Sequence, residues 1–122
     1  MNSDEEKFIT ITDLGKSGIK RNYLVILNYE NNITKVIKRF NEFQLFYNYL
    51  IGKYPFEIFP ILPEKDLKNK FQSFFSLNKS AIYYNRIERS LNSFFNYLIS
   101  NTKNERIHSD IRDFLEGKVI TY

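Results

Sequence analysis

The segment Ile33-Thr34-Lys35-Val36-Ile37-Lys38-Arg39-Phe40-Asn41-Glu42-Phe43 contains two different spacings of apolar residues. As far as Lys38 the side chains alternate, as they do in a β-strand. Asn41 is suited to cap a helix, and Gln44 follows three residues later as in a capping box. We therefore expect the chain to leave a strand and enter a helix close to Arg39. The apolar residues that then recur at helical spacing are Phe43, Phe46, Tyr47, Leu50 and Ile51.

Two more strands are predicted before this segment. Residues Phe8 to Thr12 mix β-branched and aromatic side chains, and Tyr23 to Leu27 form an apolar run. The glycines at 15 and 18 predict a turn over residues 15–18. A second turn is predicted at Glu30-Asn31-Asn32, because Asn tolerates the left-handed backbone that tight hairpins need. The first third of the chain is thus predicted to be a three-stranded antiparallel sheet.

The rest of the chain is predicted to be helical. The first helix should end near Gly52 and Pro55, and the two prolines of residues 59–65 predict a stiff extended loop. Two further helices are indicated, one from about Ile82 and one that Gly117 can close. Their apolar stripes are Ile87, Leu91, Phe94, Phe95 and Leu98, and then Ile107, Ile111, Phe114 and Leu115.

This order of elements predicts an α+β fold, with a three-stranded antiparallel sheet packed against a helical subdomain of three to four helices. The chain has 122 residues, which suits a single domain. We expect that domain to span residues 7–117, between a flexible N-terminal tail at 1–6 and a C-terminal tail at 118–122.

Composition excludes several classes of function. The chain has no cysteine and one histidine, His108, so disulfides, Cys-ligated zinc and most nucleophile–histidine pairs are ruled out. No carboxylate pair or metal cluster is visible, so we expect neither enzymatic activity nor a metal or other cofactor. The longest apolar run, Tyr23 to Leu27, is far shorter than the roughly 18 residues of a membrane span. The acidic N-terminus is unlike a secretory signal, which favours a cytoplasmic location.

Positive charge points to an anionic partner. The net charge is +4, and Arg39 stands between a predicted strand and the cap of a predicted helix. The unpaired N–H groups and the positive dipole end of that helix lie at the same corner, so a phosphate could receive both guanidinium and backbone donors. Arginine suits this role because its planar fork gives two parallel hydrogen bonds to one phosphate.

A series of motifs over about residues 8–117 carries a family resemblance. Three strands lead into Arg39-Phe40-Asn41-Glu42-Phe43, in which an Arg-aromatic pair precedes a second aromatic residue. After the first helix comes a large apolar residue followed by Pro-x-x-Pro-x-Lys, here Phe59-Pro60-Ile61-Leu62-Pro63-Glu64-Lys65. A Phe-rich helix and a short final helix ending in Phe114-Leu115 complete the series. In this order the motifs resemble the phox homology (PX) family of phosphoinositide-binding domains.

The resemblance implies a role for each matching residue. Arg39 would bind the 3-phosphate of the inositol ring, Phe40 would form the pocket floor, and Lys65 would meet the phosphate that joins inositol to glycerol. The family's helix also carries an arginine that binds the 4- and 5-hydroxyls, four residues before a leucine. Here that position is Ile87, so Arg86 is the better candidate for this contact and Arg89 the alternative.

Residues 67–79 mix bulky apolar groups with cations, which is typical of an edge that contacts a membrane. The family inserts this region into membranes. The alternative interpretation is that these aromatic residues cover the core, because they can share one helix face. The residues concerned are Phe71, Phe74, Phe75 and Leu77, with Lys68, Lys70 and Lys79 as the cations.

The expected function is therefore that of a membrane-targeting module that recognises phosphatidylinositol 3-phosphate on endosomal or vacuolar membranes, as a peripheral protein and a monomer. Other trafficking proteins are further candidate partners. The alternative is a protein-interaction or scaffold PX domain whose lipid pocket is degenerate, which the displaced helix arginine favours. A nucleic-acid partner is not expected, because most aromatic residues fall on predicted core stripes. Selectivity among phosphoinositides is left open.

Overall fold

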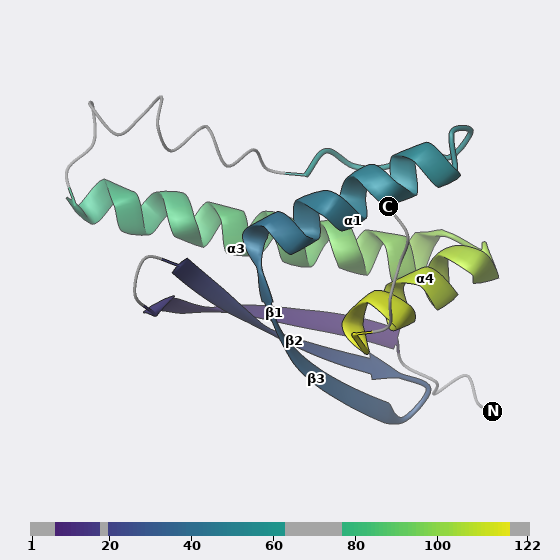
Figure 1. Cartoon of the computed structure of the whole chain (residues 1–122), viewed down its shortest axis with the longest axis horizontal. Helices are drawn as coiled ribbons and strands as arrows, with labels where there is room; N and C mark the ends of the chain where they lie inside the picture. Colours follow the sequence, from purple (N-terminus) through teal and green to yellow (C-terminus); the bar gives the residue numbers. More distant parts are fainter. Residues whose placement is uncertain (1–6, 18–19, 63–76, 118–122) are drawn as a thin grey trace.

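The computed structural model describes residues 7–17, 20–62 and 77–117, with side chains at all of these except 17 and 77–81. The described residues form three strands and then three helices (Figure 1). The predicted tails at 1–6 and 118–122 lie outside the described residues. The elements are β1 (Lys7–Ser17), β2 (Lys20–Tyr29), β3 (Asn32–Arg39), α1 (Phe40–Lys53), α3 (Leu77–Asn101) and α4 (Glu105–Leu115).

The sheet is antiparallel with strand order β1-β2-β3, so the predicted α+β fold class is confirmed. Glu30 and Asn31 form the turn between β2 and β3, with φ values of 52° and 71°. Such left-handed backbone at both central residues matches the right-handed twist of the two strands. The predicted turn at Glu30-Asn31-Asn32 is therefore confirmed.

The prediction of a turn over residues 15–18 was wrong for its first half. Gly15 and Lys16 continue β1, where they pair with Asn22 and Arg21 of β2. The register shifts between Asp13 and Gly15, and Gly15 has a φ of +84°. This is a β-bulge with glycine in the left-handed region, a conformation that a side chain would make costly. Gly15 thus bends the hairpin instead of closing it.

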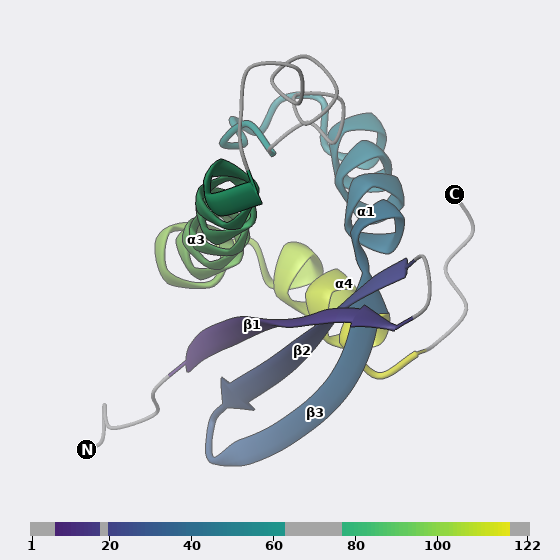
Figure 2. The ribbon, with the colours of Figure 1, turned by 90° about the vertical axis from the view of Figure 1, so that its left-hand side faces the viewer.

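All three helices lie on one side of the sheet (Figure 2). The strand residues that face them are buried, from Ile9 on β1 to Tyr29 on β2. Between sheet and helices lies an aromatic cluster in which Phe46 stacks on Phe114 with ring centroids 4.4 Å apart. Phe43 meets Phe95 edge-on at 5.6 Å. These contacts confirm that the predicted helical stripes form the core, except at Ile51, which is exposed near the end of α1.

Helix α3 begins at Leu77, earlier than the predicted Ile82, and it runs alongside the edge strand β1 (Figures 1 and 2). Asn92 accepts a hydrogen bond from the Ile11 N–H (2.7 Å) and donates one to the Ile11 carbonyl (2.8 Å). Asn96 binds both backbone groups of Ile9 in the same way, at 2.9 and 2.7 Å.

A third side chain continues this ladder, because the Glu88 carboxylate accepts the Asp13 N–H at 2.7 Å. Four helix residues advance about 6 Å and two strand residues about 6.6 Å, so side chains at positions 88, 92 and 96 stay in step with alternate strand residues. The ladder satisfies the free edge of β1 and fixes α3 lengthwise against it.

Candidate functional site

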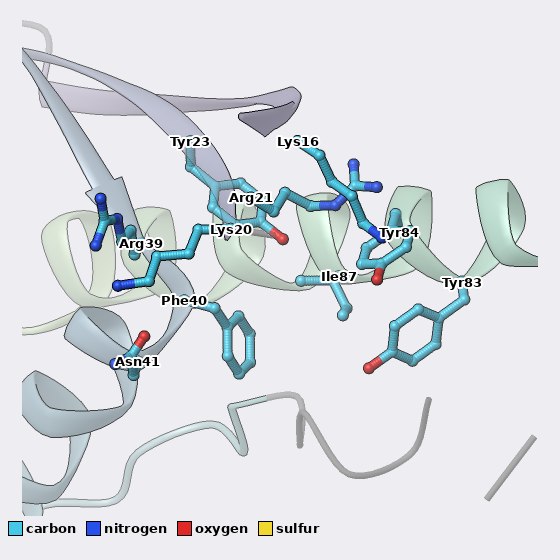
Figure 3. A pocket seen from close by; sticks show the side chains of 10 residues that line it. All are labelled: Lys16, Lys20, Arg21, Tyr23, Arg39, Phe40, Asn41, Tyr83, Tyr84 and Ile87. Carbon is cyan, nitrogen blue, oxygen red and sulfur yellow. The ribbon is translucent and has the colours of Figure 1, made fainter. Parts of the chain in front are cut away.

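A pocket of about 260 Å³ opens where three parts of the chain meet: the β1–β2 hairpin, the junction of β3 with α1, and the first half of α3. Figure 3 shows that its lining comes from all three. The lining residues are Lys16, Lys20, Arg21, Tyr23, Arg39, Phe40, Asn41, Tyr83, Tyr84 and Ile87.

Arg39 is the last residue of β3 and the N-cap of α1. Its backbone N–H donates a 2.9 Å hydrogen bond to Glu42 Oε1, so the helix is capped from Glu42 and begins at Phe40. The predicted cap at Asn41 with Gln44 was therefore wrong by two residues, because the third helical residue is the carboxylate that reaches back. Asn41 instead lines the pocket beside Arg39.

Neighbouring cations at this corner have different environments. Lys38 is buried, pairs with Glu42 at 3.6 Å and lies 4.4 Å above the Phe114 ring. Arg39 is exposed and lines the pocket, next to the N-terminal N–H groups of α1. The charge of Lys38 is thus used in contacts with Glu42 and Phe114. The Arg39 guanidinium and the positive end of the helix dipole, in contrast, are both available to an anion.

The pocket has an aromatic floor. Phe40 and Tyr23 line it, with 7% and 1% of their surfaces exposed. Burial is the main cause that raises the pKa of the Tyr23 hydroxyl, so this group stays neutral at physiological pH. An apolar face in a cationic pocket suits a sugar-like ring, because the ring offers C–H groups to the aromatic surface and phosphates to the cations.

Arg21 fixes the hairpin against α3. Its Nη1 donates to both Asp13 carboxylate oxygens, at 2.9 and 2.7 Å, and its guanidinium lies 3.5 Å from the centre of the Tyr84 ring. The Asp13 carboxylate therefore compensates the positive charge of Arg21. In contrast, Lys16, Lys20 and Arg39 form no ion pair within the described part of the chain. None of the described lining residues is acidic, so the pocket carries net positive charge.

The structure brings together Arg39 and Phe40, as the sequence predicted. The helix position that the family fills with arginine, Ile87, also lines this pocket, whereas Arg86 and Arg89 are exposed and do not line it. Lys65 and most of the predicted membrane edge lie outside the described residues, whereas Leu77 and Lys79 fall at the start of α3. The edge residues not described are Lys68, Lys70, Phe71, Phe74 and Phe75.

Of the ten lining residues, sequence reasoning named only Arg39 and Phe40 as site residues. Lys16, Lys20 and Arg21 gather around the turn between the first two strands, and this clustering of cations was a usable signal. Tyr83 and Tyr84 gave no such signal, because they belong neither to a predicted apolar stripe nor to a motif of the family resemblance. Their part in the pocket depends on where α3 docks along β1.

Among the described residues we find neither a membrane-spanning helix nor a group of metal ligands. No helix among residues 7–17, 20–62 and 77–117 has the length and apolar character needed to cross a bilayer. In the same part of the chain, no three His, Cys, Asp or Glu side chains are grouped so that they could hold a metal ion.

Comparison with known families agrees with the geometry. The PX domain model matches residues 27–118, which is more than half of the chain. No protein with a curated description matches it. PX domains are phosphoinositide-binding modules that target proteins to membranes as peripheral components, and they are generally non-catalytic. With its three-stranded sheet, its helical half and its cationic pocket at the Arg39 corner, the chain belongs to the PX domain family.

Proposed function

We propose that this chain binds phosphatidylinositol 3-phosphate in the pocket at Arg39 and thereby attaches to endosomal or vacuolar membranes. The observation that carries the proposal is that Arg39 and Phe40 line one pocket at the N-terminus of α1, with no acidic residue among the described lining residues. An anion with a ring attached meets a guanidinium, helix N–H groups and an aromatic face in this one place.

Each contact has a chemical role. Arg39 holds the 3-phosphate through two parallel hydrogen bonds, and Phe40 supports the inositol ring. Lys65 is proposed to meet the phosphate that joins the ring to glycerol. Arg86 stays a prediction, since it would have to approach from the exposed side of α3. Two or three charge-assisted contacts, less the cost of immobilisation, correspond to affinity in the micromolar range.

Stable attachment needs more than the headgroup. We propose that the apolar and cationic residues of the segment 67–79 enter the membrane interface, with each cation worth about 1 kcal/mol near an anionic surface. Because anionic lipids give the cytoplasmic leaflet its negative surface potential, we propose that the chain binds this leaflet. Binding should weaken with salt, because the lysine contribution is screened whereas insertion of apolar side chains is not.

Arg39→Ala tests the proposal. The variant should lose binding to liposomes that contain phosphatidylinositol 3-phosphate. Its thermal unfolding midpoint should stay close to that of the wild type, because Arg39 is exposed and its capping bond comes from the backbone. The matched control is Arg106→Ala, which removes an equal charge from an exposed position on α4 that does not line the pocket. Equal binding by Arg39→Ala and wild type would mean that the pocket is not the lipid site.

The second candidate function is a protein-interaction or scaffold domain. Ile87 favours it, because this pocket position lacks the arginine that the family uses to bind ring hydroxyls. A panel of liposomes, each with one phosphoinositide, separates the two functions. The control liposomes contain phosphatidylserine in place of the phosphoinositide, at equal total charge. A scaffold domain with a degenerate pocket would bind no phosphoinositide liposome more than it binds this control.

A further inference from the structure

The pocket has cations at two separate ends. In Figure 3, Arg39 and Lys20 lie toward one end, and Lys16 extends toward the other end, where its strand neighbour Arg21 stacks on Tyr84. The end at Arg39 is the one that the proposed function uses. The end at Lys16 makes none of the contacts of the proposed function.

The β-bulge is what turns Lys16 toward the pocket. On β1 the odd-numbered residues Ile9, Ile11 and Asp13 pair with the helix-facing residues of β2. The extra residue Leu14 shifts the register, so that the even-numbered Lys16 pairs with Arg21 and shares its face. Without the bulge, alternation would turn Lys16 to the outer face of the sheet.

Local contacts hold this arrangement in place. The Gly15 N–H donates a 2.7 Å hydrogen bond to Asp13 Oδ1, which closes the bulge. The same carboxylate binds Arg21, and Arg21 stacks on Tyr84 of α3. β3 ends at Arg39, opposite Asn22, so the tip of the β1–β2 hairpin extends beyond it. The ammonium of Lys16 is thus presented over the pocket by a braced hairpin tip.

At Ile87, the helix side of the pocket is apolar. Ile87 lines the pocket and is only 5% exposed, and its side chain has no hydrogen-bond donor or acceptor. A ring hydroxyl that faces Ile87 gains nothing there. A phosphate on the same side of the ring could instead extend past Ile87 to the Lys16 ammonium, whose charge no described carboxylate compensates.

We propose that Lys16 forms a second phosphate subsite, so that the pocket binds 3-phosphoinositides with a further phosphate at ring position 4 or 5 more tightly than phosphatidylinositol 3-phosphate. This inference rests on the proposed function, because Arg39 still holds the 3-phosphate. On this proposal, selectivity among phosphoinositides depends on Lys16 of the β1–β2 hairpin and not on a residue of α3. One charge-assisted contact corresponds to a preference of about tenfold.

The test uses soluble headgroups, because they separate the pocket from the general attraction between a basic protein and an anionic membrane. Isothermal titration calorimetry of the full chain would compare inositol 1,3-bisphosphate with inositol 1,3,4- and 1,3,5-trisphosphate. Wild type should bind at least one trisphosphate about tenfold more tightly than the bisphosphate. Lys16→Ala should abolish this preference and leave the affinity for the bisphosphate within about twofold of wild type. Lys35→Ala, an exposed lysine on β3 away from the pocket, is the matched control and should change neither.

The outcomes distinguish the two proposals. If the bisphosphate binds in an Arg39-dependent manner but no trisphosphate binds more tightly, the second subsite is wrong and the proposed function stands. The same conclusion follows if Lys16→Ala weakens all three ligands equally, because Lys16 would then contribute general charge. If none of the three ligands binds, the proposed function itself fails.

Discussion

Ile87 is the residue at which this chain departs most from its family. It belongs to the apolar stripe of α3 that continues through Leu91, and it also lines the pocket. One side chain therefore serves both the core and the site. The neighbouring Arg86 and Arg89 are exposed, because a helical step of one or two residues turns them away from the stripe.

Ile87→Arg should increase the affinity for inositol 1,3-bisphosphate, since it places a guanidinium where ring hydroxyls lie in the proposed pose. An increase of about tenfold is expected from one charged hydrogen-bonding contact. Because Ile87 is nearly buried, the substitution should also lower the free energy of unfolding by about 1–2 kcal/mol. Calorimetric titration and urea unfolding measure the two effects.

The control for this substitution is Ile82→Arg, at a residue of the same helix that is 51% exposed and does not line the pocket. It should leave headgroup affinity unchanged. A folded Ile87→Arg variant with wild-type affinity would show that this helix position does not face the bound headgroup.

Residues of the site differed in how far the sequence predicted them. Arg39 and Phe40 were found because they form a contiguous motif at the end of a strand. Lys16 was hidden by the bulge, since simple alternation along β1 assigns it to the opposite face of the sheet. The bulge itself has one visible sign, a glycine two residues after an aspartate whose side chain accepts the glycine N–H.

At the scale of elements, the docking of α3 on β1 determines where the two aromatic residues of α3 that line the pocket lie. The ladder of Glu88, Asn92 and Asn96 lets the helix act as a substitute for a neighbouring strand. It also sets how far α3 slides along the sheet, and hence where Tyr83 and Tyr84 meet the hairpin. The sequence predicted both elements but not their docking, because contacts between positions more than 70 residues apart leave no periodic trace.

Asn92→Ala should lower the free energy of unfolding by about 2–4 kcal/mol. The substitution leaves a partly buried N–H and carbonyl of Ile11 without partners, each at a cost of about 1–2 kcal/mol. Asn92→Asp keeps the acceptor but places a carboxylate oxygen against the carbonyl oxygens of Ile11 and Glu88, so it should not recover the stability that Asn92→Ala loses. Urea unfolding measures both. The control is Asn85→Ala, at an exposed position of the same helix, which should change stability by less than about 0.5 kcal/mol. A small effect of Asn92→Ala would mean that water replaces the ladder at no cost.

For the whole molecule, the order of strands and helices was predictable because the period of apolar residues changes once, at Arg39. What periodicity could not predict is how the far end of α1 is held. There, Lys53 donates to both Asp110 oxygens at 3.1 Å, and the Tyr54 hydroxyl donates to the same carboxylate. Asp110 lies on α4, so this cluster ties the C-terminal end of α1 to the last helix while its N-terminal end faces the pocket.

This junction predicts how stability changes at alkaline pH. Burial and then the hydrogen bond to Asp110 raise the pKa of Tyr54 to about 12, whereas a tyrosine in the unfolded chain ionises near pH 10. A group with a raised pKa stabilises the fold fully below its unfolded pKa. The free energy of unfolding should therefore fall as pH rises from about 10 to about 12, because only the unfolded state releases the proton there. The raised pKa values of Tyr23 and Lys53 act in the same direction.

Tyr54→Phe isolates the contribution of Tyr54, because it keeps the ring and removes the proton. Urea unfolding between pH 9 and pH 12 should show a shallower decline for this variant than for the wild type, together with lower stability near pH 8, where the lost hydrogen bond dominates. Parallel declines in the two proteins would locate the alkaline sensitivity elsewhere, with Lys53 and Tyr23 as the groups to test next. If Tyr54→Phe loosens α1, headgroup affinity should still fall less than in Arg39→Ala, because the tie and the pocket lie at opposite ends of α1.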